Sequence, residues 1–308
     1  MREVVQSVLV EPVTEQDGIF TTAALAPSDP VFVGKQFLDD AETYHAKYFN
    51  VGQYVDLLAA GLEGIHLGSR VRILDLGSGS GNSVLAALRL FPDAEIVATD
   101  ISPNLLRILR RVVPADSRLA CVCCDGQSLN LYPGSVNLII GAAILHHLLN
   151  PGDAVKKLAN AIGSGGAMIF YEPFEMANDI LALAYKRIVD SHRELDPKSC
   201  NFLSALVRDI EARRGMNEKE YTRFLDDKWL FTSDFFRHLA SHLGFALSIK
   251  SLHDRERPFT SEALVHARLG DIVLPDWALD LLAEYDTAFS QELREELMFT
   301  GVVTLRKP

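Results

Sequence analysis

The stretch that decides the fold reads VRILDLGSGSGNSVLAAL and covers Val71–Leu88. Val71–Leu76 is a short apolar run that predicts a buried strand, and Ser83–Phe91 has the pattern of a helix that ends before a proline. Three glycines alternate with other residues in the turn between them, where they allow positive φ angles, close backbone approach and exposed N–H groups at a helix start. These glycines are Gly77, Gly79 and Gly81.

Strands and helices continue to alternate on the C-terminal side of this unit. Ser102-Pro103 supplies an N-cap and a proline for the first turn of the next helix. Because strands that alternate with short helices form βαβ units, we predict an α/β protein with a mostly parallel sheet and helices on both faces. The predicted strands are Val71–Leu76, Glu95–Asp100, Leu119–Asp125, Ser135–Gly141, Gly166–Glu172, Phe245–Ser251 and Phe299–Leu305.

Three stretches fall outside this alternation. Residues 1–68 are predicted to form an N-terminal helical segment or lid, and residues 69–308 a single core. Insertions at residues 174–230 and 252–297 interrupt that core and are expected to build a helical cap. The last insertion carries an apolar stripe at near-helical spacing, which is expected to pack in the core, and an exposed apolar face of this insertion could pack on the sheet or on a second subunit of a homodimer. The stripe consists of Trp277, Leu281, Tyr285, Phe289, Leu293 and Leu297.

Composition narrows the class of protein. The 308 residues have a net charge of −11 and are 48% apolar, which excludes a disordered chain and argues against an extended nucleic-acid footprint, since that needs a basic face. The longest apolar run, Val136–Leu149, contains polar residues and is too short to span a bilayer. Four cysteines are too few for a disulfide framework. We therefore expect a soluble, cytoplasmic protein without nucleic-acid or membrane partners.

The glycine turn predicts a ligand site at one edge of the sheet. Its G-x-G-x-G spacing differs from the G-x-G-x-x-G of dinucleotide-binding proteins, and Asn82 stands where their third glycine is expected. No Lys-Ser/Thr pair follows the glycines, which excludes a P-loop. Asp100 ends the next strand, where a carboxylate beside the turn can accept both hydroxyls of a ribose. The alternative is that Asp100 only caps the following helix.

Five segments in the same order resemble the class I S-adenosylmethionine-dependent methyltransferases of the small-molecule type. The resemblance is close over residues 71–173 and extends in outline over residues 231–307. It implies a Rossmann-like sheet of seven strands whose last strand is antiparallel. The segments are VRILDLGSGSGNSVLAAL (Val71–Leu88), IVATDIS (Ile96–Ser102), CCDGQSL (Cys123–Leu129), SVNLIIGAAILHHL (Ser135–Leu148) and GSGGAMIFYEP (Gly163–Pro173).

The resemblance also implies which residues bind S-adenosylmethionine. Asp75 and the glycine turn would surround the amino-acid end of the cofactor, and Asp100 would hold the ribose hydroxyls. Ile101 would pack on the adenine and Asp125 would accept from its amino group, unless Asp125 and the glycine after it form a simple turn. Ala142 would line the methionine portion. The complete implied set is Asp75, Gly77, Ser78, Gly79, Gly81, Asp100, Ile101, Asp125, Gly126 and Ala142.

Candidate catalytic residues follow the fourth and fifth strands. His146 or His147 could act as a general base near neutral pH, and the alternative is a histidine that starts a helix and hydrogen-bonds locally. Glu172 ends the fifth strand and is expected either to contact substrate or to be a solvated acid. Adjacent histidines are expected to point to different sides of a helix, so no metal site is predicted.

Two further groups of residues receive a role. Tyr44, His45 and Tyr48 precede the first core strand, where the resemblance implies a helix that closes over the cofactor. The three cysteines of the third strand are predicted to pack in the core, because no matching Cys/His cluster lies nearby. These are Cys121, Cys123 and Cys124.

The leading hypothesis is transfer of the methyl group of S-adenosylmethionine to an oxygen, nitrogen or carbon atom of a small organic acceptor. The protein would align the nucleophile for in-line displacement and exclude water. The second hypothesis is a non-catalytic cofactor-binding protein or partner subunit, and the third is an enzyme that keeps the cofactor bound for a different reaction, such as a rearrangement. A nicotinamide-dependent oxidoreductase comes last, because the glycine spacing differs. The sequence leaves the acceptor open.

Overall fold

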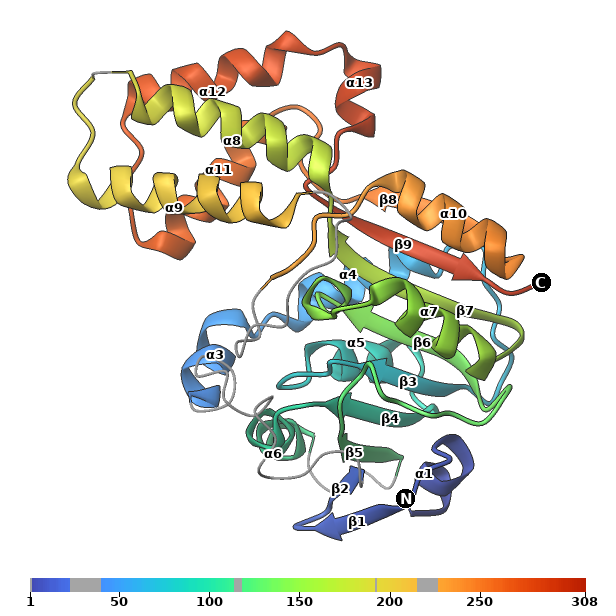
Figure 1. Cartoon of the computed structure of the whole chain (residues 1–308). Helices are drawn as coiled ribbons and strands as arrows, with labels where there is room; N and C mark the ends of the chain where they lie inside the picture. Colours follow the sequence, from blue (N-terminus) through green and yellow to red (C-terminus); the bar gives the residue numbers. More distant parts are fainter. Residues whose placement is uncertain (1, 23–39, 114–117, 192, 215–226) are drawn as a thin grey trace.

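A mixed β-sheet with a parallel centre organises the chain (Figure 1). The computed structural model describes residues 2–22, 40–113, 118–191, 193–214 and 227–308. The strands are β1 (Val13–Gln16), β2 (Ile19–Thr22), β3 (Arg72–Leu76), β4 (Glu95–Asp100), β5 (Leu119–Cys123), β6 (Val136–Ala142), β7 (Ile162–Pro173), β8 (Ala246–Ser251) and β9 (Thr300–Arg306). Their order across the sheet is β1-β2-β5-β4-β3-β6-β7-β9-β8.

All seven predicted strands are present, and β9 runs antiparallel to β7 and β8 as the resemblance implied. The sheet has nine strands because the β1–β2 hairpin extends it, with β2 lying parallel to β5. Residues 13–22 therefore belong to the sheet edge, which corrects the prediction of a lid for this part of residues 1–68. The hairpin turn is Asp17-Gly18, with φ angles of 54° and 72°. An Asp-Gly pair between two short strands is itself a hairpin signal.

Helices cover both faces of the sheet, as the alternation predicts. Successive strand residues point to opposite faces, so that Ile73 packs in one apolar cluster and Leu74 in the other. The Ile73 face carries α4 (Val51–Gly61), α5 (Asn82–Leu90) and α6 (Pro103–Val112). The Leu74 face carries α1 (Arg2–Val8), α7 (Pro151–Ala161) and α10 (Ser233–Leu243). Next to α6 lies the short helix α3 (Ala41–Tyr48).

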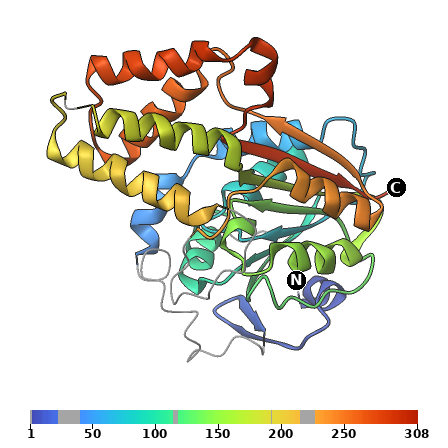
Figure 2. The ribbon, with the colours of Figure 1, turned by 45° about the horizontal axis from the view of Figure 1, so that its top comes forward.

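The two insertions after β7 and β8 form a helical layer outside the sheet (Figures 1 and 2). Apolar residues from both insertions share one buried cluster, which includes Leu203 of the first and Phe259 of the second. The predicted stripe at residues 277–297 packs within this cluster, except that Leu293 is 39% exposed. The stripe thus packs on the chain's own cap helices rather than on the sheet. The helices are α8 (Glu175–Val189), α9 (Pro197–Arg213), α11 (Pro258–Gly270), α12 (Asp276–Ala288) and α13 (Gln291–Glu296).

Three phenylalanines join the cap to the sheet at the ends of β7 and β9. Phe174 forms a parallel bridge with Phe231 and donates its backbone N–H to the carbonyl of Phe299 (2.9 Å). The buried side chain of Asn178 in α8 donates to the carbonyls of both Phe174 (2.7 Å) and Phe299 (3.0 Å). Since these contacts lie where the insertions leave the sheet, the cap is fixed at the carboxyl edge of β7.

Two predictions from composition can be compared with the structure. Within the described ranges, no helix combines the length and apolar character that crossing a membrane requires. All four cysteines carry free thiols, and the three of the predicted strand are buried, as expected for core packing. Burial raises the pKa of the Cys121 and Cys123 thiols to about 12, so neither is a thiolate at neutral pH.

Gly61 should be required for the close contact between α4 and the sheet. An added Cβ there would lie 2.6 Å from Cγ2 of Ile169 and 3.2 Å from Cγ1 of Val302. Overpacking of this kind costs about 1–3 kcal/mol, so we expect Gly61→Ala to lower the free energy of unfolding in urea by that amount. Gly52 lies exposed in the same helix, and Gly52→Ala should instead stabilise by about 0.5–1 kcal/mol. Equal stability of the two variants would contradict this account.

Candidate active site

The glycine turn between β3 and α5 has the backbone conformation that its sequence predicts. Gly77, Gly79 and Gly81 have φ angles of 67°, 53° and 110°. A Cβ at Gly77 would lie 2.7 Å from Ile144, and one at Gly81 would lie 2.6 Å from Leu109, so these two glycines allow tight packing. At Gly79 an added Cβ would face open space, which leaves room for a ligand to approach the backbone.

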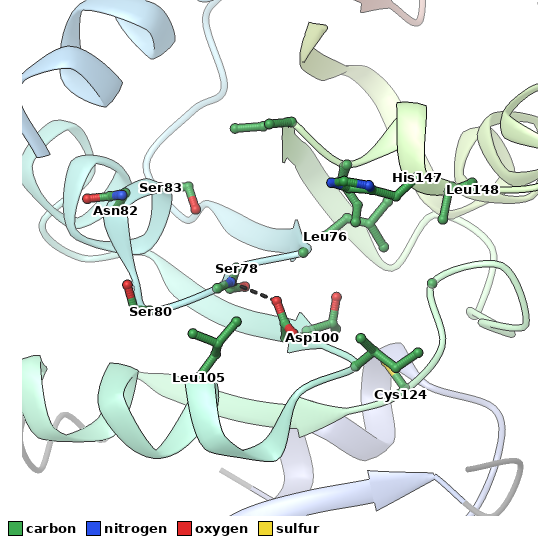
Figure 3. A pocket seen from close by; sticks show the side chains of 18 of the residues that line it. Leu76, Ser78, Ser80, Asn82, Ser83, Asp100, Leu105, Cys124, His147 and Leu148 are labelled. Atoms are coloured by element: carbon green, nitrogen blue, oxygen red, sulfur yellow. Dashed lines mark hydrogen bonds between the residues drawn. The ribbon is translucent and has the colours of Figure 1, made fainter. Parts of the chain in front are cut away.

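Asp100 connects the glycine turn to the end of β4. One carboxylate oxygen accepts from the N–H of Gly79 and the other from the N–H of Ser102, both at 2.8 Å. Figure 3 shows the carboxylate turned toward the turn. Burial raises the pKa of Asp100 to about 6. The carboxylate therefore supports the start of α6, which was the alternative role predicted from the sequence. It also lines the pocket, where the remaining lone pairs of its oxygens can accept hydrogen bonds from a ribose.

A pocket at the carboxyl edge of the parallel strands brings most of the predicted cofactor residues together (Figure 3). It encloses about 1230 Å³ of empty space, including open solvent at its mouth. Two of the predicted residues, Asp75 and Gly81, do not line it. Those that do are Gly77, Ser78, Gly79, Asp100, Ile101, Asp125, Gly126 and Ala142.

Asp75 lies beneath the glycine turn and is 1% exposed. Its Oδ2 accepts from the hydroxyl of Ser83 (2.7 Å), whereas Oδ1 is buried and has no hydrogen-bond partner among the described residues. Burial raises the pKa of this carboxyl to about 7. An unpaired buried carboxylate oxygen fits a cofactor whose α-ammonium group brings a positive donor. This feature, together with Asp100 and the open space at Gly79, matches the chemistry of S-adenosylmethionine.

The N-terminal helix α3 is attached to the glycine turn through two side chains. His45 Nδ1 and the hydroxyl of Ser80 are 2.9 Å apart. Asn82 donates to the carbonyl of Tyr48 (3.0 Å) and accepts from the N–H of Asn50 (2.9 Å), the residue that caps α4. Of the three predicted lid residues, only Tyr44 lines the pocket, while the Tyr48 side chain is 42% exposed. Asn82 therefore holds the junction between α3 and α4. It occupies the position where dinucleotide-binding proteins have their third glycine.

The structure separates the three predicted catalytic residues. Glu172 is fully buried and does not line the pocket. It accepts from the backbone N–H groups of Ile144 (3.1 Å) and Leu145 (2.8 Å), and it lies 2.6 Å from Nδ1 of His146. Burial disfavours a charged His146, but the carboxylates of Glu172 and Asp227 outweigh it and raise the pKa of the imidazole to about 9. These two residues thus organise the turn after β6, and only His147 reaches the pocket.

The two histidines lie in a 3₁₀ turn, η2 (Leu145–His147), and their ring centroids are 4.2 Å apart. The expectation that they point apart, which assumed an α-helix, is wrong. His146 Nε2 and His147 Nδ1 are each 3.4 Å from the same oxygen of Asp227, and the three ligand atoms lie within 4.8 Å of one another. This group could hold a metal ion. The guanidinium of Arg213 lies 3.3 Å from the other oxygen of Asp227, so Asp227 has a positively charged partner even when no metal ion is bound.

Several pocket residues lie outside the predicted set. Tyr54 comes from α4, and the buried Lys228 from the segment just before α10. Gln127 accepts from the N–H of Leu149 (2.7 Å) and so joins two loops at the rim. Ala143 has a φ of 57°, which is unusual for a residue other than glycine and marks backbone strain next to Ala142. No local sequence pattern distinguishes these positions, because their role depends on which loops meet at the sheet edge.

The titration of Asp75 should be visible in the stability of the cofactor-free protein. Its pKa rises from about 3.9 in an unfolded chain to about 7 in the fold, so the folded state binds the proton more tightly. This contribution is complete at low pH and is lost as the pH rises through 7. We expect the free energy of unfolding, measured by urea titration, to fall less between pH 4 and pH 8 in Asp75→Asn than in the parent. The exposed Asp93→Asn should follow the parent, and an unchanged slope in Asp75→Asn would refute this assignment.

Asn82→Ala should loosen α3 and α4 from the glycine turn. The change leaves the N–H of Asn50 and the carbonyl of Tyr48 without their partner, which costs about 1–3 kcal/mol where these groups are shielded from water. Hydrogen exchange of residues 45–53 should accelerate, while that of β3 stays unchanged. Asn130→Ala, at an exposed position with no side-chain hydrogen bond among those described, is the matched control. Equal protection in both variants would show that Asn82 does not hold the junction.

Comparison with known proteins finds methyltransferases among the relatives of this chain. Residues 74–170 match the family model of the methyltransferase domain. Over 138 residues the chain is 30% identical to a malonyl-[acyl-carrier protein] O-methyltransferase of Halorhodospira halophila. This match covers 45% of this chain and 46% of that protein. Over 116 residues it is 28% identical to a ubiquinone/menaquinone biosynthesis C-methyltransferase of Syntrophotalea carbinolica, covering 37% and 49%.

A solved structure shows the same fold over most of the chain. Phosphoethanolamine N-methyltransferase 2 of Haemonchus contortus, solved with phosphomonomethylethanolamine and S-adenosylhomocysteine, superposes with a TM-score of 0.54 at 16% identity. The match covers 92% of this chain and 61% of that one. Residues 74–170 are thus similar in sequence to methyltransferase domains. The matches to the two curated relatives span about half of their length.

Proposed function

We propose that this chain is an S-adenosylmethionine-dependent methyltransferase that acts on a small organic molecule. The observation that carries the proposal is the pocket in which the glycine turn and Asp100 meet at the carboxyl edge of a sheet of methyltransferase type. The curated relatives support the class of reaction, since they are named for O- and C-methyl transfer to different acceptors. Because these relatives are named for different acceptors, their names do not indicate one acceptor for this chain.

The residues around the pocket suggest how the chain would bind the cofactor. Asp100 would accept from the ribose, and the unpaired oxygen of Asp75 would attract the ammonium group of the methionine portion. Asp125 and Gly126, which also line the pocket, would meet the adenine. When bound, S-adenosylmethionine supplies a methyl group activated by its sulfonium. The chain would then align the acceptor and exclude water.

His147 is the candidate that this arrangement favours for proton removal from the acceptor. It lines the pocket, and its Nδ1 lies 3.4 Å from Asp227. Asp227 would be a positioning residue, held in turn by Arg213. An acceptor that needs no deprotonation would use the same pocket without this step. We place the protein in the cytoplasm, where its four free thiols would remain reduced.

Calorimetric titration with S-adenosylhomocysteine tests the proposal. The parent should bind it, and Asp100→Ala should weaken binding roughly 10- to 100-fold, because hydrogen bonds to a charged acceptor contribute about 1.5–3 kcal/mol. Asp93→Ala removes an exposed carboxylate from the opposite edge of the sheet and should leave the affinity unchanged. No binding by the parent, or equal affinity in Asp100→Ala, would refute the proposed function. Binding without methyl transfer to any of a broad acceptor panel would instead favour the non-catalytic alternative.

A further inference from the structure

Three side chains next to the cofactor pocket are grouped in the way that the ligands of a metal ion are. They are His146 and His147 of η2 and Asp227 of the segment just before α10. His146 Nε2 and His147 Nδ1 each lie 3.4 Å from Oδ1 of Asp227. Hydrogen bonds between nitrogen and oxygen are usually about 2.7–3.2 Å long, so both contacts are longer than ordinary hydrogen bonds.

The separation of 3.4 Å agrees with that of two ligands on one tetrahedral zinc ion. Zinc lies about 2.0–2.2 Å from imidazole nitrogens and carboxylate oxygens, so tetrahedral angles place two such ligands roughly 3.3–3.5 Å apart. All three ligand atoms lie within 4.8 Å of one another, which allows one ion to reach them after small rotations of the side chains. Two imidazoles and a carboxylate suit zinc better than magnesium, which prefers oxygen ligands.

Glu172 gives His146 the outer contact that a metal-binding histidine commonly has. A histidine ligand usually donates its second ring N–H to a carboxylate, a carbonyl or water, and this bond fixes the tautomer and the orientation of the ring. Here Nδ1 of His146 lies 2.6 Å from Oε2 of Glu172, and both residues are buried. The bond to Glu172 therefore leaves Nε2 of His146 directed at Asp227.

Arg213 lies on the other side of the Asp227 carboxylate and does not take the place of an ion. It is 3.3 Å from Oδ2, whereas the histidines approach Oδ1, and it also lies 3.0 Å from the carboxylate of Asp209. Even when Lys228 is counted, the carboxylates of Glu172, Asp209 and Asp227 outnumber the positive charges. The surroundings are thus net negative while both histidines are neutral, which favours a divalent cation.

This cluster lies at the wall of the cofactor pocket. His147 lines the pocket (Figure 3), and so does Lys228, which follows Asp227 in the chain. The side chains of His147 and Asp227 are 17% and 39% exposed, so an ion can enter from solvent. Three protein ligands leave the fourth position of a tetrahedral ion to water or to a substrate, which is the pattern of catalytic rather than structural zinc sites.

We propose that His146, His147 and Asp227 bind a Zn²⁺ ion at the wall of the pocket. The inference goes beyond the proposed function, because the site is defined by its own ligands and does not require methyl transfer. The fourth position of the ion would take a hydroxyl oxygen of the acceptor and favour release of its proton to solvent water. With its Nδ1 on the ion, His147 would no longer remove that proton, and the ion would replace it in this role.

Calorimetric titration of Zn²⁺ into the full chain, after dialysis against a chelator, tests the proposal. We expect the parent to bind Zn²⁺ at this site and not to bind Mg²⁺. Asp227→Asn keeps the shape of the side chain and removes its charge. It should weaken Zn²⁺ binding at least roughly 10- to 100-fold, since the loss of an outer contact alone has an effect of that size. His147→Gln should weaken binding similarly and serves as a second variant should Asp227→Asn not fold.

His238→Gln is the matched control. His238 and His242 are exposed on α10 four residues apart, a spacing at which two histidines on one helix face can bind zinc by themselves. The control should retain the parent's affinity. Absence of Zn²⁺ binding by the parent would overturn the inference, as would binding that His238→Gln abolishes and Asp227→Asn retains. Failure of the parent to bind S-adenosylhomocysteine would count against the proposed function instead, so the two failures are distinguishable.

Discussion

The fully buried carboxylate of Glu172 is the group on which the arrangement of the site depends. It accepts from three consecutive backbone N–H groups after β6, those of residues 144–146, and His146 Nδ1 lies 2.6 Å away. A buried carboxylate with this many donors is stable, whereas the N–H groups of the turn would otherwise lack partners. The carboxylate thereby sets the path of residues 144–147, which places His147 in the pocket and His146 against Asp227 of the cap.

Asp75 differs from Glu172 in its hydrogen bonding. Among the described residues, Asp75 Oδ2 accepts from Ser83, whereas its buried Oδ1 has no hydrogen-bond partner. Since a fold normally satisfies its buried polar groups, this unpaired oxygen beneath the glycine turn distinguishes the cofactor side of the site from the fully paired turn after β6.

The cap contributes to the site as well as covering it. Asp227 and Lys228 come from the end of the first insertion, and the backbone N–H of Lys228 donates to the carbonyl of His146 (2.7 Å). Trp229 donates from its indole to the carbonyl of Leu148 (2.6 Å), so the same short segment covers the turn that Glu172 organises. Because this segment precedes the Phe231 junction with Phe174, movement of the cap would displace Asp227 relative to His147.

Local sequence patterns are sufficient to predict the seven strands β3 to β9 and which of their ends face the pocket. Glycine spacing and acids at strand ends are such patterns, and the carboxyl ends of parallel strands meet at one edge, which places Asp100 and Asp125 beside the glycine turn. The rest of the site depends on tertiary packing. Glu172 shares the same strand-end pattern, yet it points inward and binds backbone N–H groups. The histidines meet because their turn is 3₁₀, and Asp227 reaches them from a segment distant in sequence, whose position no local pattern encodes.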